Sequence, residues 1–138
     1  MGDLDVILCA GQSNMLLGGV GDASLAPTPD PSLAFTFDGT SVVPLVANGG
    51  AHPSFAQTYN CLTRRAVLLV PAAVGSSSQS SISDLGAGNW DITGTLFGLA
   101  LTKLNAALVA AATAGWTTHY LGVWWAQGET DADYADTY

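Results

Sequence analysis

Positive charge is nearly absent from this sequence. Its 138 residues include 3 lysines and arginines against 11 aspartates and glutamates, which gives a formal net charge of -8 at pH 7. Nucleic acids and anionic membranes attract basic patches, so this composition excludes nucleic-acid binding and argues against a membrane partner. The composition leaves the oligomeric state open.

Cysteines and long hydrophobic runs are also scarce. Neither Cys9 nor Cys61 has the neighbouring cysteine or histidine that a zinc site needs, so we expect no metal, no cofactor and two small buried thiols. No apolar run approaches the roughly 20 residues that span a bilayer, and the acidic start lacks the basic character of a signal peptide. As given, the sequence predicts a cytoplasmic protein, with secretion by another route left open.

Apolar residues are abundant, by contrast, at 49% of the chain. This content predicts a packed core in one domain rather than a disordered segment. Three short apolar runs, at 6–10, 66–70 and 120–125, do not alternate with polar residues. Such runs indicate central strands of a parallel sheet that is covered by helices on both faces.

Two helical patterns lie between these runs. The stronger one precedes Gly115, and its apolar residues recur at spacings of four and three: Phe97, Leu101, Leu104, Leu108 and Ala111. A weaker pattern predicts a helix over 53–63, with three residues on its buried face: Phe55, Tyr59 and Leu62. We therefore expect a strand, helix, strand crossover between the second and third runs.

The remaining segments are rich in turn-forming residues. Residues 16–50 are interpreted as a surface elaboration, with a hairpin or a small edge excursion around Asp38-Gly39 and with Pro44 arguing against a central strand. Residues 75–91 have no periodicity and predict a long loop, which in a compact domain is usually functional or mobile.

Three polar groups follow the predicted strands, at the edge where open α/β sheets bind ligands. Ser13 follows the first strand and can act as a nucleophile, Gly75 follows the second and can offer its N–H, and Gln127 follows the third with a carboxamide. Each also has an ordinary interpretation, because serine and glycine favour turns and glutamine often ties down a loop. Together the three residue types suit acyl transfer.

Two separated motifs carry a family resemblance. The run Gly-Gln-Ser-Asn-Met at 11–15 and the run Gln-Gly-Glu-Thr-Asp at 127–131 resemble the SGNH-hydrolase superfamily, in its branch of carbohydrate esterases that includes sialate O-acetylesterases and acetylxylan esterases. The block at 70–77 is similar to that branch as well, although Ser76 stands where the family usually has a second glycine. The similarity extends over nearly the whole chain.

The resemblance implies an α/β fold, namely a three-layer α/β/α sandwich with a parallel, flavodoxin-like sheet. It implies Ser13 as the catalytic nucleophile, with an oxyanion hole made by the N–H groups of Ser13 and Gly75 and by the side-chain amide of Gln127. Glu129 and Asp131 would hold the Gln127 loop and the Ser13 turn in place. Further motif residues would support the site: Gln12 and Asn14.

One family feature is missing from the sequence. The family places its general base in an Asp-x-x-His motif near the C-terminus, and neither His52 nor His119 has an aspartate three residues before it. His52 is expected in an exposed loop, and His119 at the end of the sheet opposite the site. We therefore interpret 1–138 as a single esterase-like domain truncated before that block, with a C-terminally incomplete sheet and little activity of its own.

The sequence favours a serine ester hydrolase that removes O-acetyl groups from carbohydrates through an acyl-enzyme intermediate. An acetylated carbohydrate is the expected partner, and Trp90 in the long loop is the best candidate for stacking on a sugar ring. The alternative is a non-catalytic carbohydrate-binding or structural module that retains the fold. A nucleotide site at Gly18–Gly21 is poorly supported, since the run is not Gly-x-Gly-x-x-Gly and no Lys-Ser or Lys-Thr follows.

Overall fold

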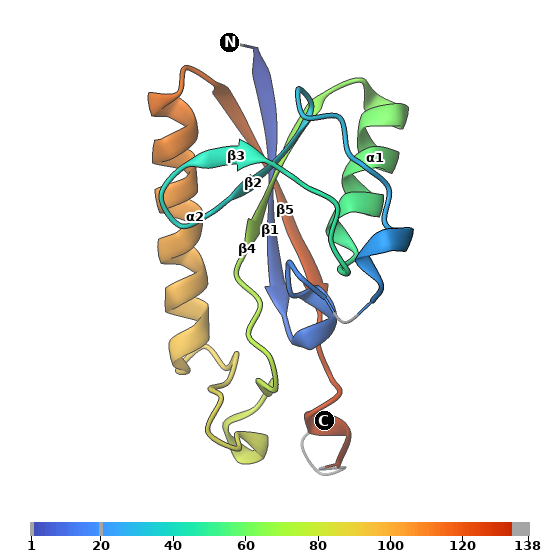
Figure 1. Cartoon of the computed structure of the whole chain (residues 1–138). Coiled ribbons are helices and arrows are strands. Elements are labelled where there is room, and N and C mark those ends of the chain that lie inside the picture. Colours follow the sequence, from blue (N-terminus) through green and yellow to red (C-terminus); the bar gives the residue numbers. More distant parts are fainter. Residues whose placement is uncertain (1, 20, 134–138) are drawn as a thin grey trace.

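A five-stranded sheet forms the centre of the computed structural model, which describes residues 2–19 and 21–133 (Figure 1). The sheet has the order β3-β2-β4-β1-β5. Its strands are β1 (Asp3–Gly11), β2 (Ala34–Phe37), β3 (Val42–Pro44), β4 (Ala66–Pro71) and β5 (Thr117–Ala126). Every pair of neighbours is parallel except the antiparallel β2–β3 hairpin. The protein therefore has an α/β fold with a mostly parallel sheet.

Two α-helices lie on opposite sides of this sheet, α1 (His52–Thr63) and α2 (Thr95–Thr113) (Figure 1). The helix α2 covers the face to which Leu4, Val6 and Leu8 of β1 point. The opposite face, with Ile7 and Cys9, packs against Ala56 of α1. The described residues also form four short 3-10 turns: η1 (Ser13–Met15), η2 (Ala23–Leu25), η3 (Ser81–Ser83) and η4 (Asp131–Asp133).

The helix α2 forms as predicted but buries a different stripe. Its buried residues are Leu96, Ala100, Leu104, Ala107 and Ala111. Phe97 and Leu101, which were expected in the core, are 46% and 42% exposed. Apolar residues surround most of this helix, so the periodicity alone does not select a face, and the alanines allow a closer approach to the sheet.

Within the described residues α2 alone is long and apolar enough to cross a membrane, yet here its alanine face packs on the sheet.

Three further expectations about packing need correction. The strand β5 lies at the edge of the sheet, so the run 120–125 is not buried on both faces, and Leu121 is 54% exposed. Leu62 is 80% exposed, because α1 turns Ala56 and Asn60 toward the core instead. Cys61 is exposed as well, whereas Cys9 is buried as expected.

The segment 16–50 is also more than a surface elaboration. The predicted hairpin is confirmed, with β3 at the edge, but β2 pairs in parallel with β4 and is an integral strand of the sheet. The strand order also differs from the flavodoxin-like order, in which the first strand lies beside the second. Here β4 is inserted between β2 and β1, and α2 then carries the chain across β1 to β5.

A close approach between β1 and β5 explains the glycine at the end of β1. Gly11 has φ +121°, and a Cβ at this position would lie 1.9 Å from the carbonyl oxygen of Ala126. We expect Gly11→Ala to lower the free energy of unfolding by about 3 kcal/mol or more, as measured by urea denaturation, because both the backbone conformation and the contact become unfavourable.

The matched control is Gly98→Ala in α2, where an added Cβ meets nothing within 4 Å. Alanine is the better helix former, so this variant should gain about 0.5–1 kcal/mol. Equal stability of Gly11→Ala and the parent protein would contradict the contact between Gly11 and Ala126.

Candidate functional site

The strands β1 and β4 are neighbours whose following segments leave the sheet toward opposite faces. After β1, Met15 in η1 packs into the cluster beneath α1. After β4, Ala72 and Trp90 pack into the cluster beneath α2. In open α/β sheets such a divergence creates a ligand crevice at the carboxyl ends of the strands. Ser13 and Gly75 flank this divergence.

Two backbone donors are free at this point. Ser13 begins η1, and the preceding residue is fixed by a 2.8 Å hydrogen bond from the Gln12 N–H to the Ala126 carbonyl. Within the described residues, the backbone N–H groups of Ser13 and Gly75 donate no hydrogen bond. Ser13 and Gly75 are both partly exposed. A serine beside free N–H groups is suited to stabilise an oxyanion.

Side chains after β1 bind the segment that follows β5. Gln12 is 6% exposed and donates from Nε2 to Oγ1 of Thr130 over 2.6 Å, while the N–H of Thr130 donates to Oε1 of Gln12 over 3.3 Å. Asn14 donates from Nδ2 to a carboxylate oxygen of Glu129. The structure therefore brings Gln12, Asn14 and Glu129 together around the Ser13 turn, at the place where supporting residues were expected.

Asp131 fastens the long loop after β4 to the segment after β5. Its carboxylate is fully buried and accepts hydrogen bonds from the N–H groups of Gln79 and Ser80, over 2.6 and 3.2 Å, and from the Ser83 hydroxyl. Burial raises the pKa of Asp131, but these hydrogen bonds outweigh burial, and the pKa lies below its ordinary value. Asp131 remains ionised at neutral pH.

Gln127 reaches the same network, in an orientation that differs from the expected one. Its Nε2 donates to the Ser77 carbonyl over 2.9 Å and to the Asp131 carboxylate over 3.2 Å. Its Oε1 is buried and has no partner among the described residues. A primary amide has two hydrogens, and both are used here, so in this structure Gln127 ties two loops together rather than offering a donor to an oxyanion.

Trp90 is buried instead of presenting an open ring face. The side chain is 7% exposed, and its Nε1 donates to the hydroxyl of Ser77 over 2.9 Å. The ring packs edge-on against Trp125, with 5.1 Å between the ring centroids. The loop folds back onto the α2 face of the sheet, so in this structure the Trp90 ring is not available for stacking on a sugar.

The buried serine Ser77 was not identified from the sequence. Its hydroxyl donates to the Val74 carbonyl over 2.8 Å and accepts from Trp90, while its carbonyl accepts from Gln127. In the sequence it is one of several consecutive serines with no periodic pattern, so no local signal distinguishes it from its exposed neighbour Ser76.

Neither histidine is hydrogen-bonded to Ser13 in the described part of the chain. His52 is fully buried, contrary to the expected exposed loop, because α1 begins there and carries the ring against Trp124 at a centroid distance of 5.6 Å. His119 lies toward the amino end of β5 and pairs with Asp3 over 3.0 Å. The described residues thus bring together the Ser13 turn and the motif residues, but not a histidine base.

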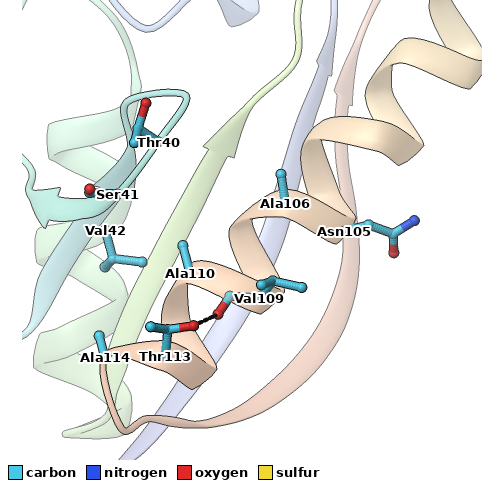
Figure 2. A pocket seen from close by; sticks show the side chains of 9 residues that line it. All are labelled: Thr40, Ser41, Val42, Asn105, Ala106, Val109, Ala110, Thr113 and Ala114. Carbon is cyan, nitrogen blue, oxygen red and sulfur yellow. Dashed lines mark hydrogen bonds between the residues drawn. The ribbon is translucent and has the colours of Figure 1, made fainter.

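Two sizeable grooves lie away from the Ser13 turn. One, of about 640 Å³, lies between the β2–β3 turn and the second half of α2, and Figure 2 shows that its walls are short side chains. Its side-chain hydrogen bond, from the Thr113 hydroxyl to the Val109 carbonyl, lies within α2. The other, of about 490 Å³, is apolar and lies between α2 and β5.

Comparison with known proteins finds similarity to a solved structure. No protein-family model and no curated protein matches this sequence. A protein from Arabidopsis thaliana, solved by X-ray crystallography at 1.6 Å resolution, is similar in structure with a TM-score of 0.63 and 19% sequence identity. The match covers 92% of this chain and 58% of the Arabidopsis chain, so this chain spans little more than half of that protein's length. At this identity the likeness shows the α/β fold alone.

Proposed function

We propose that this chain carries the nucleophile and the oxyanion hole of a serine ester hydrolase. The observation that carries the proposal is a partly exposed serine, Ser13, just after β1, where the N–H groups of Ser13 and Gly75 donate no hydrogen bond within the described residues. The hydrogen bonds from Gln12 and Asn14 to the segment after β5 hold this turn in place. Fixed donors of this kind act without reorganising during the reaction.

In the proposed reaction, Ser13 Oγ attacks the acyl carbon of an ester. The carbonyl oxygen becomes an oxyanion and accepts hydrogen bonds from the N–H groups of Ser13 and Gly75. The hydroxyl proton passes to a general base and then to the departing alcohol, and water later releases the acid from the acyl-enzyme. In this mechanism the base lies outside the described residues, and Gln127 and Asp131 act as positioning residues.

The substrate class and the complete fold are part of the same proposal. The motif resemblance at 11–15 and 127–131 favours an O-acetylated carbohydrate as the ester. We further propose that the two helices and the sheet belong to a three-layer α/β/α sandwich completed by a C-terminal segment that carries the base. The 58% coverage of the Arabidopsis chain is compatible with such a segment.

The proposal is tested by trapping the acyl-enzyme. We expect p-nitrophenyl acetate to acetylate Ser13 slowly, and the adduct to persist because within the described residues no histidine is hydrogen-bonded to Ser13 to activate water for its hydrolysis. Peptide mass spectrometry after incubation locates the acetyl group. Added imidazole should accelerate release of p-nitrophenol through Ser13 by accepting its proton.

Two variants make this experiment specific. In Ser13→Ala the adduct should be absent, and added imidazole should release p-nitrophenol only at the rate of its own direct reaction with the ester. Ser54→Ala, at an exposed serine of α1, should keep both the adduct and the additional release. Acetylation confined to Lys103, or an adduct that survives in Ser13→Ala, would refute the proposed nucleophile.

The non-catalytic alternative is favoured by one observation, namely that neither histidine is hydrogen-bonded to Ser13 in the described residues. A carbohydrate-binding module would bind an acetylated oligosaccharide without consuming it, and binding would be unchanged in Ser13→Ala. Calorimetric titration of the parent protein and of this variant separates the two functions.

A further inference from the structure

The side chain of Leu16 lies beside the proposed oxyanion hole. A Cβ at Gly75 would lie 3.6 Å from Cδ1 of Leu16. Apart from the chain neighbours of Gly75, no other described residue has an atom within 4 Å of that position. Leu16 is partly buried and partly open to solvent. In the described part of the chain it is therefore the side chain that borders the Gly75 donor.

The backbone of Leu16 is fixed at both of its polar groups. Its N–H donates to the Ser13 carbonyl over 3.1 Å, and its carbonyl accepts from the Gly19 N–H over 3.0 Å. Gly50 packs against this carbonyl so closely that a Cβ there would lie 2.9 Å from its oxygen. The preceding residue, Met15, is buried in the cluster beneath α1. The leucine side chain thus extends from a backbone with little room to move.

The turn that carries Gly75 is fixed as well. The Val74 N–H donates to the Gly11 carbonyl over 2.9 Å, and the Ser77 N–H donates to the Val74 carbonyl over 3.3 Å. Both sides of the contact between Leu16 and Gly75 are therefore held in place. A packed contact of this kind resists added bulk, because neither side can shift without breaking hydrogen bonds.

The chemistry of Leu16 indicates which part of an ester it would contact. An ester whose carbonyl oxygen lies at the N–H groups of Ser13 and Gly75 has two arms, the acyl group and the alcohol. A leucine side chain offers no hydrogen bond, so sugar hydroxyls buried against it would lose their bonds to water. The methyl group of an acetyl gains from leaving water. Leu16 therefore fits the acyl arm.

We propose that Leu16 forms the wall of the acyl subsite and limits the acyl group to about the size of acetyl. This inference rests on the proposed function, since it needs an ester held at Ser13 and Gly75. A longer acyl chain would have to displace a side chain whose backbone is fixed. Apolar subsites of this kind discriminate by roughly tenfold or more for one methylene.

Acylation of Ser13 by p-nitrophenyl acetate and by p-nitrophenyl butyrate tests this proposal. Peptide mass spectrometry follows the adduct on Ser13, and each rate is divided by the rate at which imidazole alone cleaves the same ester. The parent protein should favour acetate, and Leu16→Ala should raise the butyrate-to-acetate ratio about tenfold or more. Leu16→Val removes one methylene and should give an intermediate ratio, which keeps the test decisive if Leu16→Ala folds poorly.

The matched control is Leu17→Ala, because Leu17 packs against the cluster beneath α1. Its butyrate-to-acetate ratio should equal that of the parent protein. Acylation of Ser13 with an unchanged ratio in both Leu16 variants, or an equal shift in Leu17→Ala, would overturn the role of Leu16 and leave the proposed function standing. No acylation of Ser13 in the parent protein by either ester would refute the proposed function, and the role of Leu16 with it.

Discussion

Replacing Asp131 with alanine should lower the free energy of unfolding by about 3–5 kcal/mol, a large part of the stability of a domain this size. The carboxylate is fully buried, and its removal leaves the N–H groups of Gln79 and Ser80 without their acceptor and leaves the hydroxyl of Ser83 with the more distant Ser80 carbonyl only. The buried side of the network then also lacks the charge that its donors face, and a donor that loses its partner away from water is costly. Urea denaturation measures the loss.

A local measurement shows whether the loss arises at the site. In Asp131→Ala the amides of Gln79 and Ser80 should exchange hydrogen much faster than in the parent protein, while amides in the centre of β4 keep most of their protection. Asp22→Ala is the matched control, since the carboxylate of Asp22 is exposed and accepts from one N–H, that of Ser24. Similar losses in the two variants would show that the Asp131 network contributes nothing beyond an ordinary turn.

The Asp131 variant also separates stability from catalysis. Under the proposed function, Asp131 acts through Gln127 and the loop after β4, so Asp131→Ala should slow the acetylation of Ser13 even at temperatures where the protein is fully folded. An unchanged acetylation rate would assign Asp131 to stability alone. The comparison uses the same adduct measurement as Ser13→Ala.

The central strands were predictable because short apolar runs that do not alternate with polar residues indicate strands buried on both faces. Val6–Ala10 and Ala66–Val70 lie in β1 and β4, which are buried on both faces as expected. The third run also forms a strand, but its place at the edge depends on whether another element covers it, and no local pattern encodes that. Similarly, apolar periodicity predicted the helix α2 but not which of its faces is buried. The buried face includes Ala100, whose small side chain packs on the sheet.

The sequence predicted which segments of the chain carry the candidate site, but not how their side chains are oriented. The motifs correctly marked the places where β1, β4 and β5 end, and the structure links these ends through Gln12, Asn14 and Asp131. The orientation of single side chains was not predictable, because it depends on partners far away in the sequence. Gln127 donates to a carbonyl 50 positions earlier, and Trp90 is drawn into the core by Ser77.

His52 gives the second large effect, a loss of stability in acid. Its ring is fully buried, and both ring nitrogens lack a hydrogen-bond partner among the described residues. Burial lowers the pKa of His52 from 6.5 to about 4, and the nearby backbone of Met15, which falls short of a full hydrogen bond, opposes this only in part. The folded protein therefore keeps this ring neutral where the unfolded chain protonates it.

The sign of the effect follows from proton binding. Between pH 6.5 and about 4 the unfolded chain binds a proton at His52 that the folded protein does not, so the free energy of unfolding falls as the pH is lowered through this range. At about 1.4 kcal/mol per pH unit, the full range corresponds to about 3 kcal/mol. Asp5 and Asp131 affect the free energy of unfolding mainly below this pH window, because hydrogen bonds hold the pKa of each carboxyl under its usual value. For Asp5 the hydrogen bond from Arg65 is the main cause.

Urea denaturation at a series of pH values tests this expectation. The parent protein should lose about 3 kcal/mol between pH 7 and pH 4, and His52→Phe, which places an apolar ring of similar size against Trp124, should lose much less. The control is His119→Phe, whose exposed ring is 45% accessible and should leave the pH profile close to that of the parent protein. Since the Met15 backbone lies near His52, protonation of the ring should also loosen the Ser13 turn. The protection factor of the Met15 amide, relative to intrinsic exchange at the same pH, should therefore fall in acid in the parent protein but not in His52→Phe. Parallel pH profiles for the parent protein and His52→Phe would show that the ring is not buried in its neutral form.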